Sequence, residues 1–200
     1  WNNKFGGSKG TNLEVYSGDL DHNGDNDVIL ALTRRDMLAP VRGRDRSAQE
    51  MPFIKTKYPT YESFAKAKFT DIYPEEMLKR GVHQQVSSMS SAYLRNNGDG
   101  TFSSGDLPSA CQAGPVKAFY VGDINGDTHL DFIYAGNHLP TEIETARYDG
   151  LYPGVCLGDG KGNFTCNTAM IGGKLRIEDA RDIQRIKLAD GRQVFLIANN

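Results

Sequence analysis

The hydrophobic residues of this chain fall in short runs that are separated by polar turns. Residues 28–32 and 132–135 are continuously apolar, and the mostly apolar stretches 13–16 and 118–121 lie upstream of them. Runs this short, bounded by Gly, Asn and Asp, are typical of buried strands rather than helices. An acidic loop joins the two runs of each pair, so the pattern predicts two strand–loop–strand units.

A second element also recurs, because residues 92–103 are similar to residues 154–165. Both read as strand, Gly/Asp-rich turn and strand, which is typical of a hairpin. The repeated unit therefore has four strands, with one copy at 13–103, another at 117–166 and part of a third at 175–200. Such repeats predict an all-β fold of β-propeller blades, each with four antiparallel strands. Since a propeller closes with about four to eight blades, we expect a partial propeller from a larger protein.

The first unit is the longer one because it carries an insertion, residues 34–91. Residues 60–69 predict a short helix, and Pro74 with the acidic residues after it predicts the start of a second. One face of the first helix is expected to carry Tyr61, Phe64, Ala65 and Lys68. Two interpretations stay open for this helical insertion. It is either a cap that docks a partner or sets specificity, or a structural lid across one face of the propeller.

The two acidic loops are the candidate metal sites. In each nine-residue loop, positions 1, 3, 5 and 9 carry oxygen-bearing side chains, and position 7 offers its backbone carbonyl or, in Asp25, also a carboxylate. Calcium takes six to eight oxygen ligands at short range, which a tight loop with alternate residues turned inward supplies. The candidate ligands of the first loop are Asp19, Asp21, Asn23, Asp25 and Asp27. The candidate ligands of the second loop are Asp123, Asn125, Asp127, His129 and Asp131.

This spacing predicts two calcium sites, and the alternative is a pair of solvated acidic turns. The loops are not EF-hands, because an EF-hand has a bidentate Glu at position 12. Leu30 and Tyr134 stand at that position here. In the partial third unit, the corresponding register carries a plain turn, residues 189–192, in place of the ligands. That unit is not expected to bind metal.

On these loops the chain resembles FG-GAP/VCBS repeats, the blades of integrin-α-like β-propellers. Over residues 61–69, 136–149 and 157–165, in this order, it resembles large VCBS/ASPIC-type surface proteins of Bacteroidota. The resemblance covers nearly the whole chain. It implies a calcium-stabilised propeller that is secreted or on the cell surface, in association with the outer membrane, and that serves recognition or assembly without established catalysis. Thr128 departs from the family, which usually has Gly there; because other residues strain such a turn, the second site is expected to be weaker or distorted.

Composition and charge agree with this interpretation. The chain has 22 Gly and 8 Pro, which suits a turn-rich β architecture, and its formal net charge is -2. No basic field favours nucleic acid as a partner, and no membrane span is visible in the sequence. The expected partners are a protein or glycan ligand, other subunits of a surface assembly and the remainder of the same chain.

The cysteines give a prediction about the compartment. Cys156 and Cys166 flank the turn of the second hairpin, so they could face each other as a cross-strand disulfide, or lie there as two small apolar side chains. A disulfide would fit an oxidising compartment. Cys111 is expected to be a buried thiol rather than a nucleophile, because no matching His/Asp arrangement accompanies it.

A polar loop, residues 137–149, is the second candidate site. Its candidate ligand-binding residues are His138, Glu142, Glu144, Arg147, Tyr148 and Asp149. The two Glu residues could act as paired carboxylates in glycoside hydrolysis, or the imidazole and the Asp as acid and base. Sugar binding by Tyr stacking and Arg hydrogen bonds, and a loop held by internal salt bridges, are the other interpretations. The overall prediction is a non-enzymatic calcium-binding module for recognition or assembly, with a carbohydrate-active enzyme as the alternative.

Overall fold

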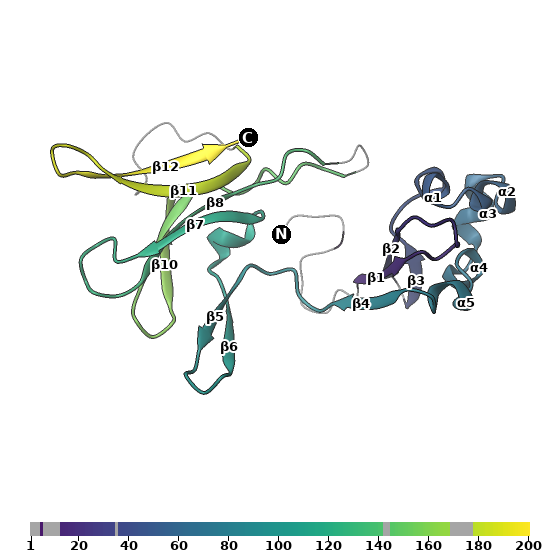
Figure 1. The fold of residues 1–200 in the computed structure, drawn as a ribbon, viewed down its shortest axis with the longest axis horizontal. Coiled ribbons are helices and arrows are strands. Elements are labelled where there is room, and N and C mark those ends of the chain that lie inside the picture. The colour runs from purple at the N-terminus through teal and green to yellow at the C-terminus, as the bar shows by residue number, and fades with distance from the viewer. Residues whose placement is uncertain (1–4, 6–12, 35, 142–144, 169–177) are drawn as a thin grey trace. The chain divides into compact units, whose positions relative to one another are not determined.

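The computed structural model describes residues 5, 13–34, 36–141, 145–168 and 178–200. It is mostly β-structure, built around two four-stranded antiparallel sheets (Figure 1). The chain forms two compact units, one of Ser8–Met89 and one that contains Ser90–Asn200. We call them the N-terminal unit and the C-terminal unit. The prediction of a mostly β protein is therefore confirmed.

The sheet of the N-terminal unit contains the first predicted strand pair. Strands β1 (Leu13–Gly18) and β2 (Asp27–Arg34) pair antiparallel, with Gly18 opposite Asp27. Strand β3 (Met37–Pro40) pairs with β2, and β4 (Val82–Val86) pairs with β1. The order is thus β3-β2-β1-β4.

This sheet differs from the expected unit of residues 13–103. We expected the hairpin at 92–103 to complete it, but in the described part of the chain β5 (Ala92–Asn96) and β6 (Phe102–Asp106) form a separate two-stranded sheet. The physical reason is that both edges of the β1–β2 pair are already paired with other strands. Strands β3 and β4, both from the segment expected as a helical insertion, occupy the two edges of the β1–β2 pair.

Five short helices lie between β3 and β4. They are α1 (Arg44–Glu50), α2 (Phe53–Lys57), α3 (Tyr61–Lys66), α4 (Phe69–Ile72) and α5 (Glu75–Leu78). The predicted helix at 60–69 corresponds to α3, which Thr60 caps through a capping box with Ser63, and α4 begins only at its last residue, Phe69. The predicted helix after Pro74 is α5, with Pro74 as its N-cap.

These helices form a common core with one face of the N-terminal sheet. Tyr16, Ile29 and Ala31 of the sheet pack in one cluster with buried helical side chains such as Ile54 and Ile72. Of the residues expected on one helical face, Phe64 is buried and Tyr61 is 66% exposed, so that face does not pack into the core as a whole. Helices that share the sheet's core favour the interpretation of this segment as a structural lid within its own unit.

In the sheet of the C-terminal unit, each strand pairs with the strand that is next to it in the sequence. Strands β7 (Val116–Gly122), β8 (Asp131–Gly136), β9 (Gly154–Gly158) and β10 (Phe164–Asn167) are antiparallel neighbours in the order β10-β9-β8-β7. Four antiparallel strands were predicted for this stretch, and four are found. The hairpin of β11 (Ala180–Lys187) and β12 (Gln193–Asn199) follows, and β11 lies against β7 and β8 (Figure 1).

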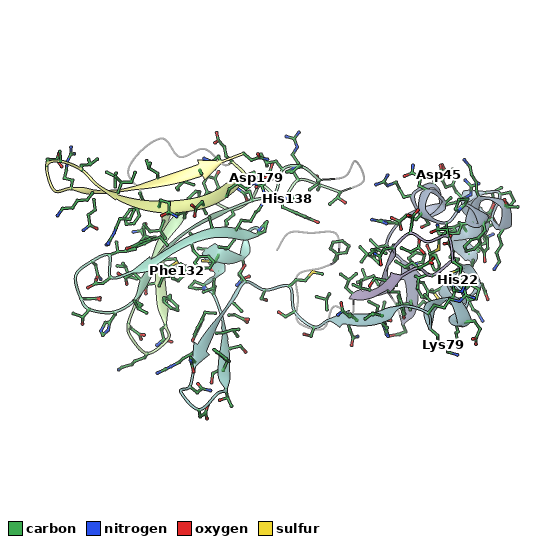
Figure 2. The ribbon with its side chains drawn as sticks, in the orientation of Figure 1. His22, Asp45, Lys79, Phe132, His138 and Asp179 are labelled. Carbon is green, nitrogen blue, oxygen red and sulfur yellow. A yellow bond between two sulfur atoms is a disulfide. The ribbon has the colours of Figure 1, made fainter. Side chains whose placement is uncertain are left out.

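Alternate residues of β8 serve two different cores, as the two faces of a strand require. Ile133 and Ala135 pack with Ile183 of β11 on one face. Phe132 and Tyr134 pack on the other face with Cys111, which lies in the 3-10 helix η1 (Ser109–Gln112). Figure 2 labels Phe132 within this sheet.

Candidate metal centres

The two acidic loops occupy equivalent positions in their sheets. The first joins β1 to β2, and the second joins β7 to β8. Gly18 stands opposite Asp27 where the first loop closes, and Gly122 stands opposite Asp131 where the second closes. In both loops, therefore, the last acidic residue is also the first residue of the following strand.

The first loop brings three carboxylates together. One oxygen from each of Asp19, Asp21 and Asp27 lies within 4.8 Å of the others. Asp27 is 3% exposed and accepts a hydrogen bond of 2.9 Å from the backbone N–H of Leu20. Burial raises the pKa of Asp27, and the negative charge of Asp21 raises it further. A cation placed among these oxygens would relieve both effects.

The second loop brings together Asp123, Asp127 and Asp131, again with oxygens within 4.8 Å of one another. Asp131 is fully buried and accepts backbone N–H bonds from Ile124 at 2.8 Å and from Gly158 at 2.9 Å. The pKa of Asp127 is lowered, first by the hydrogen bond from the Asn125 amide and then by the His129 backbone N–H. The Asp127 carboxylate therefore remains charged at neutral pH.

The remaining predicted ligands take other roles. Asn23 and Asn125 each accept the backbone N–H two residues later through their side-chain oxygens, at 2.7 and 3.0 Å. The first loop thus has an Asp at position 3 and an Asn at position 5, whereas the second loop has them in the reverse order. Asp25 and His129, at position 7, are outside the carboxylate groups of the described residues. This arrangement favours the backbone carbonyl as the contribution of position 7.

The backbone of each loop turns through the left-handed region at positions 4 and 6. His22 (φ 63) and Gly24 (φ 92) do so in the first loop, and Gly126 (φ 85) and Thr128 (φ 72) in the second. The conformation expected to strain Thr128 is present. His22, labelled in Figure 2, is an equivalent departure in the first loop, and the sequence analysis missed it. Each loop therefore holds one non-glycine residue in a conformation that costs about 1–2 kcal/mol.

Position 2 of each loop was also missed. Leu20 is fully buried in the core shared with the helices, and Ile124 packs against the core between β8 and β11. Both loops therefore have an apolar anchor beside their first carboxylate. The signal was present in the sequence, because position 2 is the one apolar residue common to the first half of both loops.

The structure describes the second candidate site in part. His138 and Tyr148 form an isolated β-bridge, with N···O distances of 2.8 and 3.1 Å. Arg147 and Asp149 are exposed. Glu142 and Glu144 lie outside the described residues, so the hypothesis of paired carboxylates stays a prediction.

The base of this loop is closed by Asn137, a buried residue with φ 79. Its side chain accepts from the N–H of Leu151 and donates to the carbonyl of Leu151, both at 2.9 Å. Beside it, Lys117 lies 3.5 Å from His138 and 2.6 Å from Asp179, and Figure 2 shows His138 and Asp179 close together. These contacts favour the interpretation in which the described part of the loop is structural.

Comparisons of the chain with protein-family models, with curated proteins and with solved structures found no match. The interpretation of the two loops therefore depends on their own geometry and chemistry. Among the described helices, none has the length and apolar character that crossing a membrane requires.

Of the two interpretations left open for Cys156 and Cys166, the structure has the disulfide. Cys156 and Cys166 are directly opposite each other on β9 and β10 and form a disulfide. Cys111 is a buried free thiol. Burial raises its pKa to about 11, which disfavours a role as a nucleophile toward external substrates at neutral pH.

Proposed function

We propose that this chain is a calcium-binding β-propeller module of a secreted or cell-surface protein that mediates recognition or assembly, with calcium in a structural role. The observation that carries the proposal is the convergence of three carboxylates in each of two loops at equivalent register positions. Carboxylates this close repel one another unless a cation neutralises them. Clustered carboxylate, amide and carbonyl oxygens are the ligands that calcium prefers.

A structural role for the ion is supported by the place of each loop in its sheet. The last carboxylate of each loop is buried and accepts a backbone N–H from position 2. Ion binding would therefore close the turn that pairs the two strands, which couples metal binding to folding. The millimolar calcium found outside cells suffices even for weak sites of this kind.

A secreted or surface location is supported by the Cys156–Cys166 disulfide. Disulfides form and persist in oxidising compartments and are rare in the cytosol. The resemblance to surface proteins of Bacteroidota points the same way, and it also supplies the propeller architecture in this proposal.

A role in protein assembly is supported by one face of the C-terminal sheet. Phe119 is 64% exposed and Leu130 is 66% exposed, and with Leu94 and Val121 they line an open groove of about 450 Å³. An exposed apolar patch of this kind marks an interaction site. Because the groove is lined mainly by apolar side chains, it favours an apolar protein surface over a glycan as the partner.

The test is the binding of calcium to the metal-free chain in equilibrium dialysis with radioactive calcium. We expect two ions per chain, one fewer in Asp19→Ala and one fewer in Asp123→Ala. Asp190→Ala is the matched control, since Asp190 is an acidic turn residue of the β11–β12 hairpin that bonds only Arg192 among its described partners. Its stoichiometry should stay at two, and a chain that binds no calcium at millimolar concentration would exclude the proposal.

A further inference from the structure

The three cysteines of the chain meet in one place in the C-terminal unit. Cys111 lies in η1, Cys156 on β9 and Cys166 on β10. The free thiol sulfur of Cys111 is 3.9 Å from the sulfur of Cys156, which is already bonded to Cys166. Cys111 and Cys156 are both fully buried. A free thiol thus stands next to the buried sulfur of a disulfide.

We propose that these cysteines form an internal thiol–disulfide exchange centre, in which the chain isomerises between a Cys156–Cys166 and a Cys111–Cys156 linkage. Cys111 gives up its proton to solvent, and the thiolate attacks the sulfur of Cys156. The Cys156–Cys166 bond breaks, and Cys166 leaves with the bonding electron pair and takes up a proton. One disulfide and one thiol are present before and after the step, so no oxidant or reductant is required.

The surroundings of Cys111 suit this reaction. Phe132, Tyr134 and Leu151 enclose it together with Cys156. The Tyr134 hydroxyl is buried and makes no hydrogen bond that fixes it elsewhere in the described structure. It faces the Cys111 thiol and partly offsets the rise in the pKa of that thiol. The hydroxyl is therefore placed to donate to the thiolate when it forms.

The product linkage would change the connectivity of the unit. The present disulfide joins residues 10 apart within one hairpin, whereas Cys111 and Cys156 are 45 apart. A longer closed loop restricts the unfolded chain more, which favours the new linkage in the chain-entropy account of disulfide stability. The exchange would tie η1 to β9 and would leave the half-buried Cys166 as a free thiol on β10.

The rate is expected to depend on pH. Burial raises the pKa of Cys111 to about 11, and the titratable group facing it from β8 is the Tyr134 hydroxyl, whose own pKa burial raises to about 12. The described neighbours in η1, β9 and β10 add only the two disulfide cysteines. Because the thiolate is the attacking species, the rate should rise about tenfold per pH unit between pH 7 and pH 9.

Trypsin makes the two linkages easy to distinguish, because it separates the cysteines onto three peptides, residues 96–117, 148–161 and 162–174. The oxidised full chain is incubated without added thiol at pH 7 and at pH 9, quenched with acid, alkylated in denaturant, digested and mapped by mass spectrometry. We expect peptide 96–117 to become linked to 148–161, with the alkyl group moving to 162–174. The alkyl group remaining on 96–117 at both pH values would overturn the proposal.

Two variants sharpen the test. Cys111→Ala should keep the Cys156–Cys166 linkage and show no alkylated cysteine at either pH. Cys166→Ser in a glutathione redox buffer should form the Cys111–Cys156 disulfide, whereas glutathione adducts alone would mean that the two sulfurs cannot meet. A yield of exchanged product that rises with protein concentration would also overturn the proposal, because the exchange would then run between molecules.

Discussion

Calcium is expected to stabilise the two units of this protein separately. The first acidic loop lies in the unit Ser8–Met89 and the second in the unit that contains Ser90–Asn200. Each unit has its own hydrophobic clusters, so the melting of one unit does not require the melting of the other. Removal of calcium with EDTA should therefore lower the midpoint temperatures of two separate unfolding transitions in differential scanning calorimetry.

The size of each shift follows from mass action. At a free calcium concentration of one hundred times the dissociation constant, one site adds about 2.7 kcal/mol to the free energy of unfolding. In a domain of roughly this size, about 1 kcal/mol moves the midpoint by about 4–8 °C. Each transition should therefore rise by about 10–20 °C between EDTA and saturating calcium.

Single substitutions in the two loops show which loop causes the calcium-dependent rise of each midpoint. Asp19→Ala should abolish the calcium-dependent rise of one transition and leave the other unchanged, and Asp123→Ala should do the reverse. Both residues are exposed, unlike Asp27 and Asp131, so their replacement should cost little stability in EDTA. The reasoning is refuted if calcium moves neither transition, or if either substitution reduces both shifts equally. Asp190→Ala, outside the loops, should behave as the wild type.

Three further predictions concern stability measured by urea denaturation in EDTA. Thr128→Gly should raise the free energy of unfolding of the C-terminal unit by about 0.5 kcal/mol, because relief of a left-handed residue outweighs the entropy that glycine gains when unfolded; a lower midpoint would contradict this. Asp179 is buried, and its pKa is lowered, chiefly by the hydrogen bond from Lys117. The pair therefore stabilises the fold at pH values above the unfolded pKa of about 3.9. This stabilisation is lost as the pH falls through the lowered pKa of the folded state. Asp179→Asn should cost about 3 kcal/mol at pH 7 by leaving a partly buried cation unpaired, with the difference shrinking below pH 4, and a constant difference at all pH values would argue against it. Asn137→Ala should cost about 3 kcal/mol, because the N–H and the carbonyl of Leu151 lose their buried partners; an unchanged midpoint would show that water replaces them.

The sequence predicted the strands whose signal is local. Continuous apolar runs at 28–32 and 132–135 lie in β2 and β8, and β8 is buried along its length. The pairing partners of β1 could not be predicted in the same way. Strand β4 reads Val-His-Gln-Gln-Val and is mostly exposed, so it carries no apolar pattern and depends on the edge of β1 for its structure.

In the helical segment between β3 and β4, the sequence predicted helices only at residues 60–69 and after Pro74. Helices α1 and α2 were missed because residues 44–57 are rich in charge and are interrupted by Pro52. The buried apolar residues here are Met51, just after α1, and Ile54 in α2, and they do not repeat with a helical period long enough to recognise. Helices this short obtain most of their stability from tertiary contacts.

The candidate metal centres were predictable in position and only partly in detail. The spacing of acidic residues identified both loops, since alternate residues in a tight turn face inward. In the first loop the sequence did not distinguish Asp21 from Asp25 as the third carboxylate, because positions 3 and 7 both carry an acid there and only Asp21 joins the group. Nor did it identify Gly158, whose contact with Asp131 spans 27 residues.

The last carboxylate of each loop has a further consequence for strand register. Asp27 and Asp131 each begin a strand and accept the N–H at position 2 of the loop, so a slip of one residue would break this bond. A slip of one residue also turns every side chain of a strand to the opposite face, which in β8 would exchange Ile133 for Phe132. We therefore expect the acidic loop to select the strand register during folding. A chain paired out of register would not bring the three carboxylates together, so a bound cation would stabilise only the correctly aligned strands.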